Sequence, residues 1–200
     1  MVWVFPGCAE VLANAFRFTN ALIRDDFPTL DFPAKAISIL GKFGGDINDY
    51  KFPRQVNEAG LPIIAIPTTA GTGSEVTRFT IITDETNNEK LLCVGMGFMP
   101  IAAIIDYSLT MSVPPRTTAD TGIDAMTHAI EAYVSTANSE FTDPLAIFAI
   151  KMIQEDLVPS YNGDMTKRAS MHNAQCLAGM AFSNALLGIV HSMAHKTGAV

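Results

Sequence analysis

Hydrophobic positions divide this chain into a region of short apolar runs and a region of helical periodicity. In the first region, residues 61–66 form a continuous apolar run bounded by turn-forming residues. Such a run is typical of a strand that is buried on both faces, as in a parallel sheet. Further strands are predicted over 76–83, 91–94 and 101–105, and helices over 9–23 and 34–40, with a polar loop at 46–60.

After Pro114, apolar residues recur at helical spacing to the end of the chain. Four helices are predicted: from Thr117 or Thr118, either of which can cap the first, to about Val134; from Asp143-Pro144 to about Leu157; after the cap Asp164; and after Ser183-Asn184. The pattern changes between Ser112 and Pro115. We therefore predict an α/β part over residues 1–113, built on a parallel sheet, and an all-α domain over residues 114–200.

Composition limits the classes of protein to which the chain can belong. Its 200 residues are 48% hydrophobic and 16% charged, which is typical of a globular protein. The net charge of −7 argues against nucleic acid as a partner, because phosphate binding needs clustered Lys and Arg. The longest apolar run, 91–105, is interrupted by glycine and proline, so we expect no membrane span. Three cysteines without a CxxC pair and an N-terminus without a basic start predict a cytoplasmic protein with free thiols.

Two pairs of side chains at helical spacing carry the candidate chemistry. Asp124 and His128 are four residues apart in a predicted helix, and so are His191 and His195. Residues at this spacing share one helical face, so each pair can point to one site. One oxygen and two nitrogen ligands from Asp124, His128 and His191 suit Fe²⁺, Zn²⁺, Mn²⁺ or Co²⁺ and do not choose among them. His195 is a candidate for a fourth ligand or for a proton relay beside the metal.

The segment directly after the buried run is a candidate ligand-binding loop. Residues 67–75 combine two glycines with four hydroxyl side chains at the carboxyl end of a strand, where ligands bind in open α/β sheets. Glycine lets a ligand approach the backbone and the hydroxyls can donate to phosphate or ribose, although an ordinary polar turn fits the pattern equally well. Taken alone, Lys90 is interpreted as a solvated edge residue, Phe182 as a core residue, and His172 as a structural or surface histidine.

The order of these motifs resembles that of the iron-containing (group III) alcohol dehydrogenases, a family that includes lactaldehyde reductase, 1,3-propanediol dehydrogenase and butanol dehydrogenases. The resemblance extends from about Ala34 to Val200. It is carried by residues 61–75 (LPIIAIPTTAGTGSE), 119–133 (ADTGIDAMTHAIEAY), 175–184 and 191–195 (HSMAH). Several long motifs in the same order are more specific than any one of them.

The resemblance implies a Rossmann-like nucleotide-binding α/β domain followed by a helical metal-binding domain, with the site in the cleft between them. It implies hydride transfer between a small alcohol or aldehyde and NAD or NADP, with Fe²⁺ or Zn²⁺ as a Lewis acid. It further implies roles for individual residues: Asp124, His128 and His191 as metal ligands, His195 in proton transfer, Phe182 in the substrate pocket, and Thr68, Thr69, Thr72, Lys90 and Leu109 in dinucleotide binding.

Two features of the family pattern are not matched. The family has a further metal-binding histidine in a Pro-His-Gly motif downstream of His195, and the residues up to Val200 do not contain it. Its Gly-Gly-Gly-Ser pyrophosphate loop has no counterpart in residues 20–30, which lack glycine, and residues 1–30 match nothing in the family. We therefore expect an incomplete α/β part, a fragment with exposed apolar patches, and assembly into a homodimer or larger oligomer. The alternatives are an inactive fragment or non-catalytic metal-binding remnant of the family, and a relative similar to glycerol dehydrogenase or dehydroquinate synthase.

Overall fold

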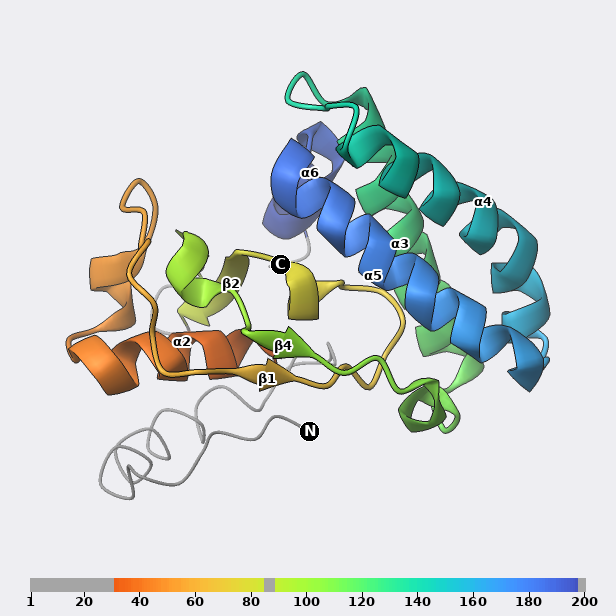
Figure 1. Ribbon diagram of the computed structural model, residues 1–200, viewed down its shortest axis with the longest axis horizontal. Coiled ribbons are helices and arrows are strands. Elements are labelled where there is room, and N and C mark those ends of the chain that lie inside the picture. The colour runs from red at the N-terminus through yellow and green to blue at the C-terminus, as the bar shows by residue number, and fades with distance from the viewer. Residues whose placement is uncertain (1–30, 85–88, 198–200) are drawn as a thin grey trace.

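A computed structural model describes residues 31–84 and 89–197 of the chain. Two parts lie side by side: the strand part, which we define as the described residues up to 113, and the helical part, residues 115–197 (Figure 1). The change from strands to long helices therefore falls where the hydrophobic pattern changes. The helix predicted over 9–23 lies outside the described residues.

The strand part begins with helix α2, Asp31–Phe43, which is longer than the predicted 34–40. The sequence predicts that Gly41 and the turn pair Gly44-Gly45 stop this helix, and the structure continues it past Gly41 to Phe43. It ends at Gly44, which has a φ of 71° and donates its N–H to the Leu40 carbonyl over 2.8 Å. Glycine tolerates this left-handed conformation without steric cost, which is why it terminates helices so often.

Strands β1, Ile64–Ala65, and β4, Ala102–Ala103, form a parallel pair. The pairing confirms the sheet type expected for the buried run, but both strands are shorter than predicted. Proline lacks the N–H group that a ladder needs, and Pro62 and Pro100 stand just before the two strands. Because the strands are parallel, the loops that follow them leave the sheet at the same edge, toward the helical part (Figure 1).

Strands β2, Phe79–Asp84, and β3, Glu89–Val94, form a second, antiparallel sheet with Phe79 opposite Val94. The prediction of one parallel sheet is wrong for this pair. A parallel connection needs a dozen or more residues, whereas only residues 85–88 separate the two strands. The short connection therefore dictates the antiparallel arrangement.

A buried lysine ties α2 to β2. Lys35 is 1% exposed, and its Nζ donates to the Thr77 carbonyl at 2.7 Å, to Thr77 Oγ1 at 3.0 Å and to the Phe79 carbonyl at 3.0 Å. Several oxygen acceptors around one ammonium group offset much of the cost of burying its charge. Around this link lies an apolar core formed by α2, η1 (Ile47–Tyr50), β2, β3 and η3 (Met96–Phe98).

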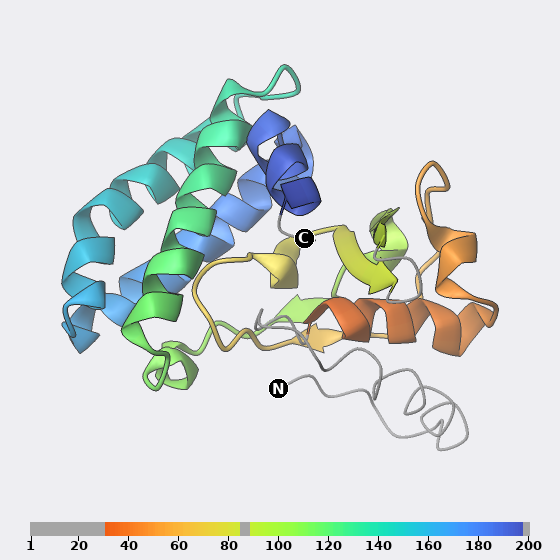
Figure 2. The ribbon, with the colours of Figure 1, turned by 180° about the vertical axis from the view of Figure 1, so that it is seen from behind.

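The helical part consists of α3 (Pro115–Val134), α4 (Thr142–Tyr161), α5 (Arg168–Ala185) and α6 (Ile189–Thr197). In Figure 2, α3 runs along α4 and α5, and the short α6 lies near the C-terminal end of α3. Small side chains dominate the interfaces, and nine alanines are fully buried there: Ala125, Ala129, Ala132, Ala146, Ala149, Ala174, Ala178, Ala181 and Ala185. Small residues at these positions let the three long helices approach one another closely.

Two of the predicted helix starts need correction. Helix α3 begins at Pro115 after Pro114, and Thr118 does not cap it but donates its hydroxyl to the Pro114 carbonyl at 3.0 Å. Proline has no N–H to satisfy and has a helix-like φ, so it opens the helix without a side-chain cap. Helix α4 begins at Thr142, one residue before the predicted cap Asp143. Asp164 does act as a cap, for the 3-10 turn Met165–Lys167 that leads into α5.

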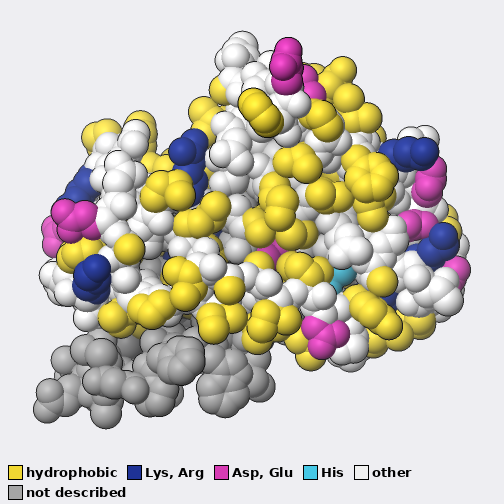
Figure 3. Space-filling model, viewed as in Figure 1, with side chains coloured by type: hydrophobic (Ala, Val, Ile, Leu, Met, Phe, Trp, Pro, Cys, Tyr) yellow, Lys and Arg dark blue, Asp and Glu magenta, His cyan; other side chains and the backbone are white. Residues whose placement is uncertain are grey.

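Apolar side chains remain exposed on the helical part, as the sequence predicts. Figure 3 shows hydrophobic side chains spread over the face that carries α4, α5 and α6. The most exposed large ones are Phe141, Ile189, Val134 and Val158. No single helix in residues 31–84 and 89–197 has the length and apolar character to cross a bilayer, and only the pair 165–185 and 189–195, bent by 102°, reaches these criteria together.

Candidate metal and cofactor site

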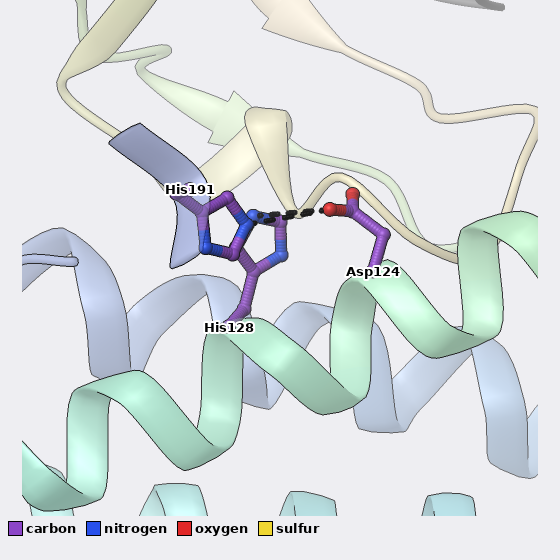
Figure 4. A group of neighbouring side chains, drawn as sticks. All are labelled: Asp124, His128 and His191. Carbon is purple, nitrogen blue, oxygen red and sulfur yellow. Dashed lines mark ion pairs between the residues drawn. The ribbon is translucent and has the colours of Figure 1, made fainter. Parts of the chain in front are cut away.

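The candidate site lies where α6 meets α3. Asp124 and His128 stand one turn apart on α3, and His191 comes from the first turn of α6 (Figure 4). Asp124 Oδ1 lies 3.4 Å from His191 Nε2 and 3.7 Å from His128 Nε2. One ligand atom of each side chain lies within 4.8 Å of those of the other two. The structure thus brings together the three side chains that the sequence singled out as candidate ligands.

The donor set suits a divalent cation. The side chains of His128 and His191 are 7% and 11% exposed, whereas that of Asp124 is 32% exposed. Imidazole nitrogen together with carboxylate oxygen is a combination that zinc, iron and similar ions accept. Three protein donors leave coordination positions for further ligands, and the exposure of Asp124 keeps one side of the group open to them.

Burial and charge act differently on the two histidines. Desolvation lowers the pKa of His128 to about 4, against the opposing influence of Asp124, so its ring is neutral at pH 7, as a metal ligand must be. For His191, burial also disfavours the charged form, but the hydrogen-bonded carboxylates of Asp124 and Glu131 outweigh it and raise the pKa of the ring. The two carboxylates therefore make this place favourable for positive charge.

Aromatic rings form a wall behind the donor atoms. The rings of His128 and His191 stack with their centroids 4.4 Å apart. The ring of Phe182 also stacks with that of His128, with the centroids 4.3 Å apart. Phe79 of the strand part lies 6.5 Å from Phe182, centroid to centroid. Phe182 is 6% exposed, so the core interpretation is correct, and it also lies directly beside the candidate site, where the resemblance places it.

His195 lies one turn beyond His191 on α6. The centroids of the two rings are 6.3 Å apart. Burial lowers the pKa of His195, and the nearby charges of His191 and Lys90 lower it further. A half-buried imidazole that is neutral near pH 7 can accept or release a proton, which is the role that the resemblance implies.

Glu131 is a member of this group that the sequence reasoning missed. Its Oε2 lies 2.5 Å from His191 Nδ1, and its Oε1 accepts the backbone N–H of Val190 at 2.8 Å. Glu131 is only 6% exposed. The sequence did hold a signal, because Asp124, His128 and Glu131 follow the i, i+4, i+7 spacing of a single helical face. His172 has no part in the group, since it is fully buried within α5, in line with its structural interpretation.

The loop 67–75 reaches the site from the strand part. A Cβ on Gly71 would come within 2.6 Å of the Thr121 carbonyl oxygen on α3, and a Cβ on Gly73 within 2.7 Å of Gly179 Cα on α5. Gly73 also donates its N–H to Gln175 Oε1 at 2.7 Å. These two glycines therefore serve close packing against the helices. Their role in admitting a ligand to the backbone stays a prediction.

The predicted dinucleotide contacts fall into three places. Thr69 is buried in the loop, with Thr68 and Thr72 half-buried on either side of it. Lys90 lies on β3, donates to Thr83 Oγ1 at 3.3 Å and acts electrostatically on His195, so it faces the site rather than only solvent. Leu109 lies in η4, Tyr107–Thr110, near the N-terminal end of α3 and away from α6.

Residues 30–107 match the family described as iron-containing alcohol dehydrogenase, and residues 118–200 match the C-terminal part of the Fe-containing alcohol dehydrogenase family. The NADPH-dependent butanol dehydrogenase of Clostridium saccharobutylicum is 56% identical over 156 residues, which are 78% of this chain and 40% of that protein. The chain thus spans less than half of this relative.

Solved structures show the same fold. The alcohol dehydrogenase from Oenococcus oeni superposes with a TM-score of 0.84 and 33% identity, over 98% of this chain and 53% of that one. Sulfoacetaldehyde reductase from Bifidobacterium kashiwanohense, solved in complex with NAD⁺, superposes with a TM-score of 0.83 and 31% identity, over 98% of this chain and 54% of that one. With both parts of the sequence matched in order and the fold shared, the chain belongs to the iron-containing alcohol dehydrogenase family.

Proposed function

We propose that this chain provides the metal-binding and dinucleotide-binding centre of an alcohol dehydrogenase that transfers a hydride between a small alcohol or aldehyde and NAD or NADP. The observation that carries the proposal is the convergence of Asp124, His128 and His191 on one point, with donor atoms within 4.8 Å of one another. The family, and relatives named as alcohol dehydrogenases, support the reaction class.

Asp124, His128 and His191 would hold the ion, Fe²⁺ or Zn²⁺. Bound there, such an ion supplies Lewis-acid polarisation of an alcohol or carbonyl oxygen. The residues fit it, because the low pKa of His128 keeps a lone pair free and two carboxylates balance the positive charge. Phe182 and the stacked histidine rings would exclude water from one side of the site.

The chain's own residues would divide the remaining work. The hydroxyls of Thr68, Thr69 and Thr72 would bind the dinucleotide from the loop that abuts His128, with Lys90 and Leu109 as further contacts. The similarity to an NADPH-dependent butanol dehydrogenase and to a reductase bound to NAD⁺ supports a nicotinamide dinucleotide without choosing between the two forms. His195 would exchange the alcohol proton with solvent at its half-buried ring.

Metal titration tests the proposal directly. The chain is titrated anaerobically with Fe²⁺, and separately with Zn²⁺, by calorimetry, alongside Asp124→Ala and His128→Ala. The matched control is Asp120→Ala, which removes an exposed carboxylate one turn earlier on the same helix. We expect binding by the wild type and the control, and an affinity loss in both site variants greater than the roughly 10–100-fold that outer partners of a metal site contribute.

Two results would contradict the proposal. Equal, weak binding by all four proteins would show that the three side chains do not form a metal site. Tight binding without NADH- or NADPH-linked reduction of a small aldehyde would favour the alternative of a non-catalytic metal-binding chain.

Assembly and location complete the proposal. The exposed apolar side chains of the helical part favour a homodimer or larger oligomer, because contiguous apolar surface drives association. Light scattering of the purified chain tests this, and a monodisperse monomer would contradict it. The unpaired, buried thiols of Cys93 and Cys176 suit the cytoplasm, where cysteines stay reduced.

A further inference from the structure

Glu131 connects the two helices that build the candidate site. Its Oε1 accepts the Val190 N–H at 2.8 Å, and its Oε2 faces His191 Nδ1 at 2.5 Å. Gly188 leaves no room for a side chain here, because a Cβ would come within 2.8 Å of Oε1. Burial raises the pKa of Glu131, but the hydrogen bonds with His191 and with the backbone of Val190 and Gly188 outweigh it and lower the pKa. Each oxygen of this buried anion thus meets a donor.

This arrangement selects one tautomer of His191. A carboxylate accepts hydrogen bonds and donates none, and carboxylates lie beside both ring nitrogens of His191. Glu131 is the nearer one, at 2.5 Å from Nδ1 against 3.4 Å between Asp124 and Nε2, so the proton of a neutral His191 is drawn to Nδ1. The Nε2 lone pair is then left on the side of Asp124 Oδ1, 3.4 Å away. We propose that Glu131 is a positioning residue for the metal site: it fixes the tautomer and the ring orientation of His191 and anchors the start of α6 on α3. This inference rests on the proposed function, whose metal would be bound by that lone pair.

A purely structural ion pair would not require this geometry. Glu131 could stabilise α6 through the Val190 N–H alone, since the first N–H groups of a helix lack intrahelical partners and favour a nearby anion. The second oxygen is instead directed at Nδ1 of His191. The other ring nitrogen of His191 is the one that faces Asp124 (Figure 4). Metal-binding histidines generally hold their other ring N–H in this way, and loss of the partner typically costs about 10–100-fold in metal affinity.

The isosteric variant Glu131→Gln separates the two roles. A glutamine has one acceptor oxygen and one donor NH₂ group. With its oxygen on the Val190 N–H, its NH₂ group faces His191 Nδ1 and forces the ring proton to Nε2, which blocks the lone pair. The helix anchor is then kept while the tautomer is reversed. Glu140→Gln is the matched control, because Glu140 is exposed and lies on the loop after α3.

The experiment reads the tautomer without any metal. Two-dimensional ¹⁵N–¹H spectra of the histidine rings are recorded over a pH series that extends above the raised pKa of His191, so that its ring is neutral, and His191 is assigned from its absence in His191→Gln. We expect Nδ1–H in the wild type and in Glu140→Gln, and Nε2–H in Glu131→Gln. We also expect Zn²⁺ affinity by calorimetry to fall about 10–100-fold in Glu131→Gln and to be unchanged in the control.

The outcomes separate this inference from the proposed function. An Nε2–H tautomer in the wild type would overturn the positioning role, whatever happens to the variant, including failure of Glu131→Gln to fold. Unchanged tautomer and unchanged affinity in Glu131→Gln would overturn it too. If the wild type shows the Nδ1–H tautomer but binds no metal at Asp124, the proposed function fails while the assignment of the hydrogen bond stands.

Discussion

The helical part and the strand part secure their functional residues by different means. In the helical part, helical spacing alone places Asp124 above His128, and one long-range contact, Glu131 with His191, adds the third donor. In the strand part, the loop 67–75 has little support from its own sheet, in which only two residues of each strand pair. Its shape comes from packing against α3 and α5.

The difference shows which part depends on the other. The metal-site residues lie within a helical core whose interfaces are built from buried alanines. The loop contributes Ala70 to that helical core, and the Gly73 N–H donates a hydrogen bond to Gln175 on α5. We therefore expect damage at the loop–helix contact to disturb both parts, and damage inside the strand part to leave the metal site intact.

The largest loss of stability is expected from Gly73→Ala, which disrupts the contact between the loop of the strand part and α5 of the helical part. Gly73 has a φ of 60°, and an added Cβ would lie 2.7 Å from Gly179 Cα, a backbone atom that cannot move aside alone. The left-handed backbone and the overlap together should lower the free energy of unfolding by about 2–4 kcal/mol, measured by urea denaturation.

The matched control for this variant is Gly44→Ala. Gly44 has a φ of 71°, but nothing lies within 4 Å of its added Cβ, so only the backbone cost of about 1–2 kcal/mol applies. Equal losses in the two variants would mean that the loop shifts away from α5 without cost, and the dependence of the loop on the helices would then be wrong.

This difference between local and long-range contacts explains which parts of the candidate site could be predicted from the sequence. The pair Asp124 and His128 was predictable because an i, i+4 relation is fixed by helix geometry, whatever the rest of the fold does. The bond between Glu131 and His191 joins residues 60 apart, and no local pattern places α6 on α3. Likewise, the role of Gly71 and Gly73 depends on what lies opposite them, which composition does not reveal.

The pairing of the strands could be predicted from the sequence better than their length. The parallel pairing of β1 and β4 was expected from a continuous apolar run, but the predicted burial on both faces is wrong, since Ile64 is half-buried and Ala102 and Ala103 are exposed. Strand length and burial depend on how many neighbours pair, and the sequence does not show that. The antiparallel pairing of β2 and β3 could have been predicted, because the connection of residues 85–88 is too short for a parallel crossover.

A somewhat smaller loss of stability is expected from Lys35→Met. This variant tests whether damage inside the strand part leaves the metal site intact. The substitution removes the ammonium group that donates to Thr77 and Phe79 and leaves their buried oxygens without it. Hydrogen bonds to charged groups contribute about 1.5–3 kcal/mol each in favourable cases, and after partial compensation by relaxation we expect a loss of about 2–3 kcal/mol. Zn²⁺ affinity of the folded variant should not change.

Lys42→Met is the control on the same helix, because its Nζ lies at an exposed position, where it donates to the Ala59 carbonyl and stands 5.1 Å from the centroid of the Phe43 ring. We expect its stability to stay within about 0.5 kcal/mol of the wild type. A parallel fall of stability and Zn²⁺ affinity in Lys35→Met, absent in the control, would show that the metal site does depend on the strand part.

The smallest effect is expected from Asp156→Asn, which tests how the helical part holds itself together. Asp156 Oδ1 lies 2.8 Å from Lys167 Nζ, and joins α4 to the turn before α5. Burial would raise the pKa of Asp156, but hydrogen bonds to Lys167 and Ser170 prevail and lower it below the ordinary 3.8. The folded state therefore binds this proton less readily than the unfolded chain, so the pair stabilises the fold above pH 3.8 and loses that contribution as the pH falls through the folded pKa.

Urea denaturation at neutral pH and below pH 3.8 measures this difference. Asp156→Asn should be less stable than the wild type at neutral pH, and the two should converge at the acidic end, because a protonated carboxyl and an amide are both neutral. Asp120→Asn, which removes an exposed partner of Arg116, should match the wild type at both. A gap for Asp156→Asn that persisted in acid would assign its effect to packing and not to the ion pair with Lys167.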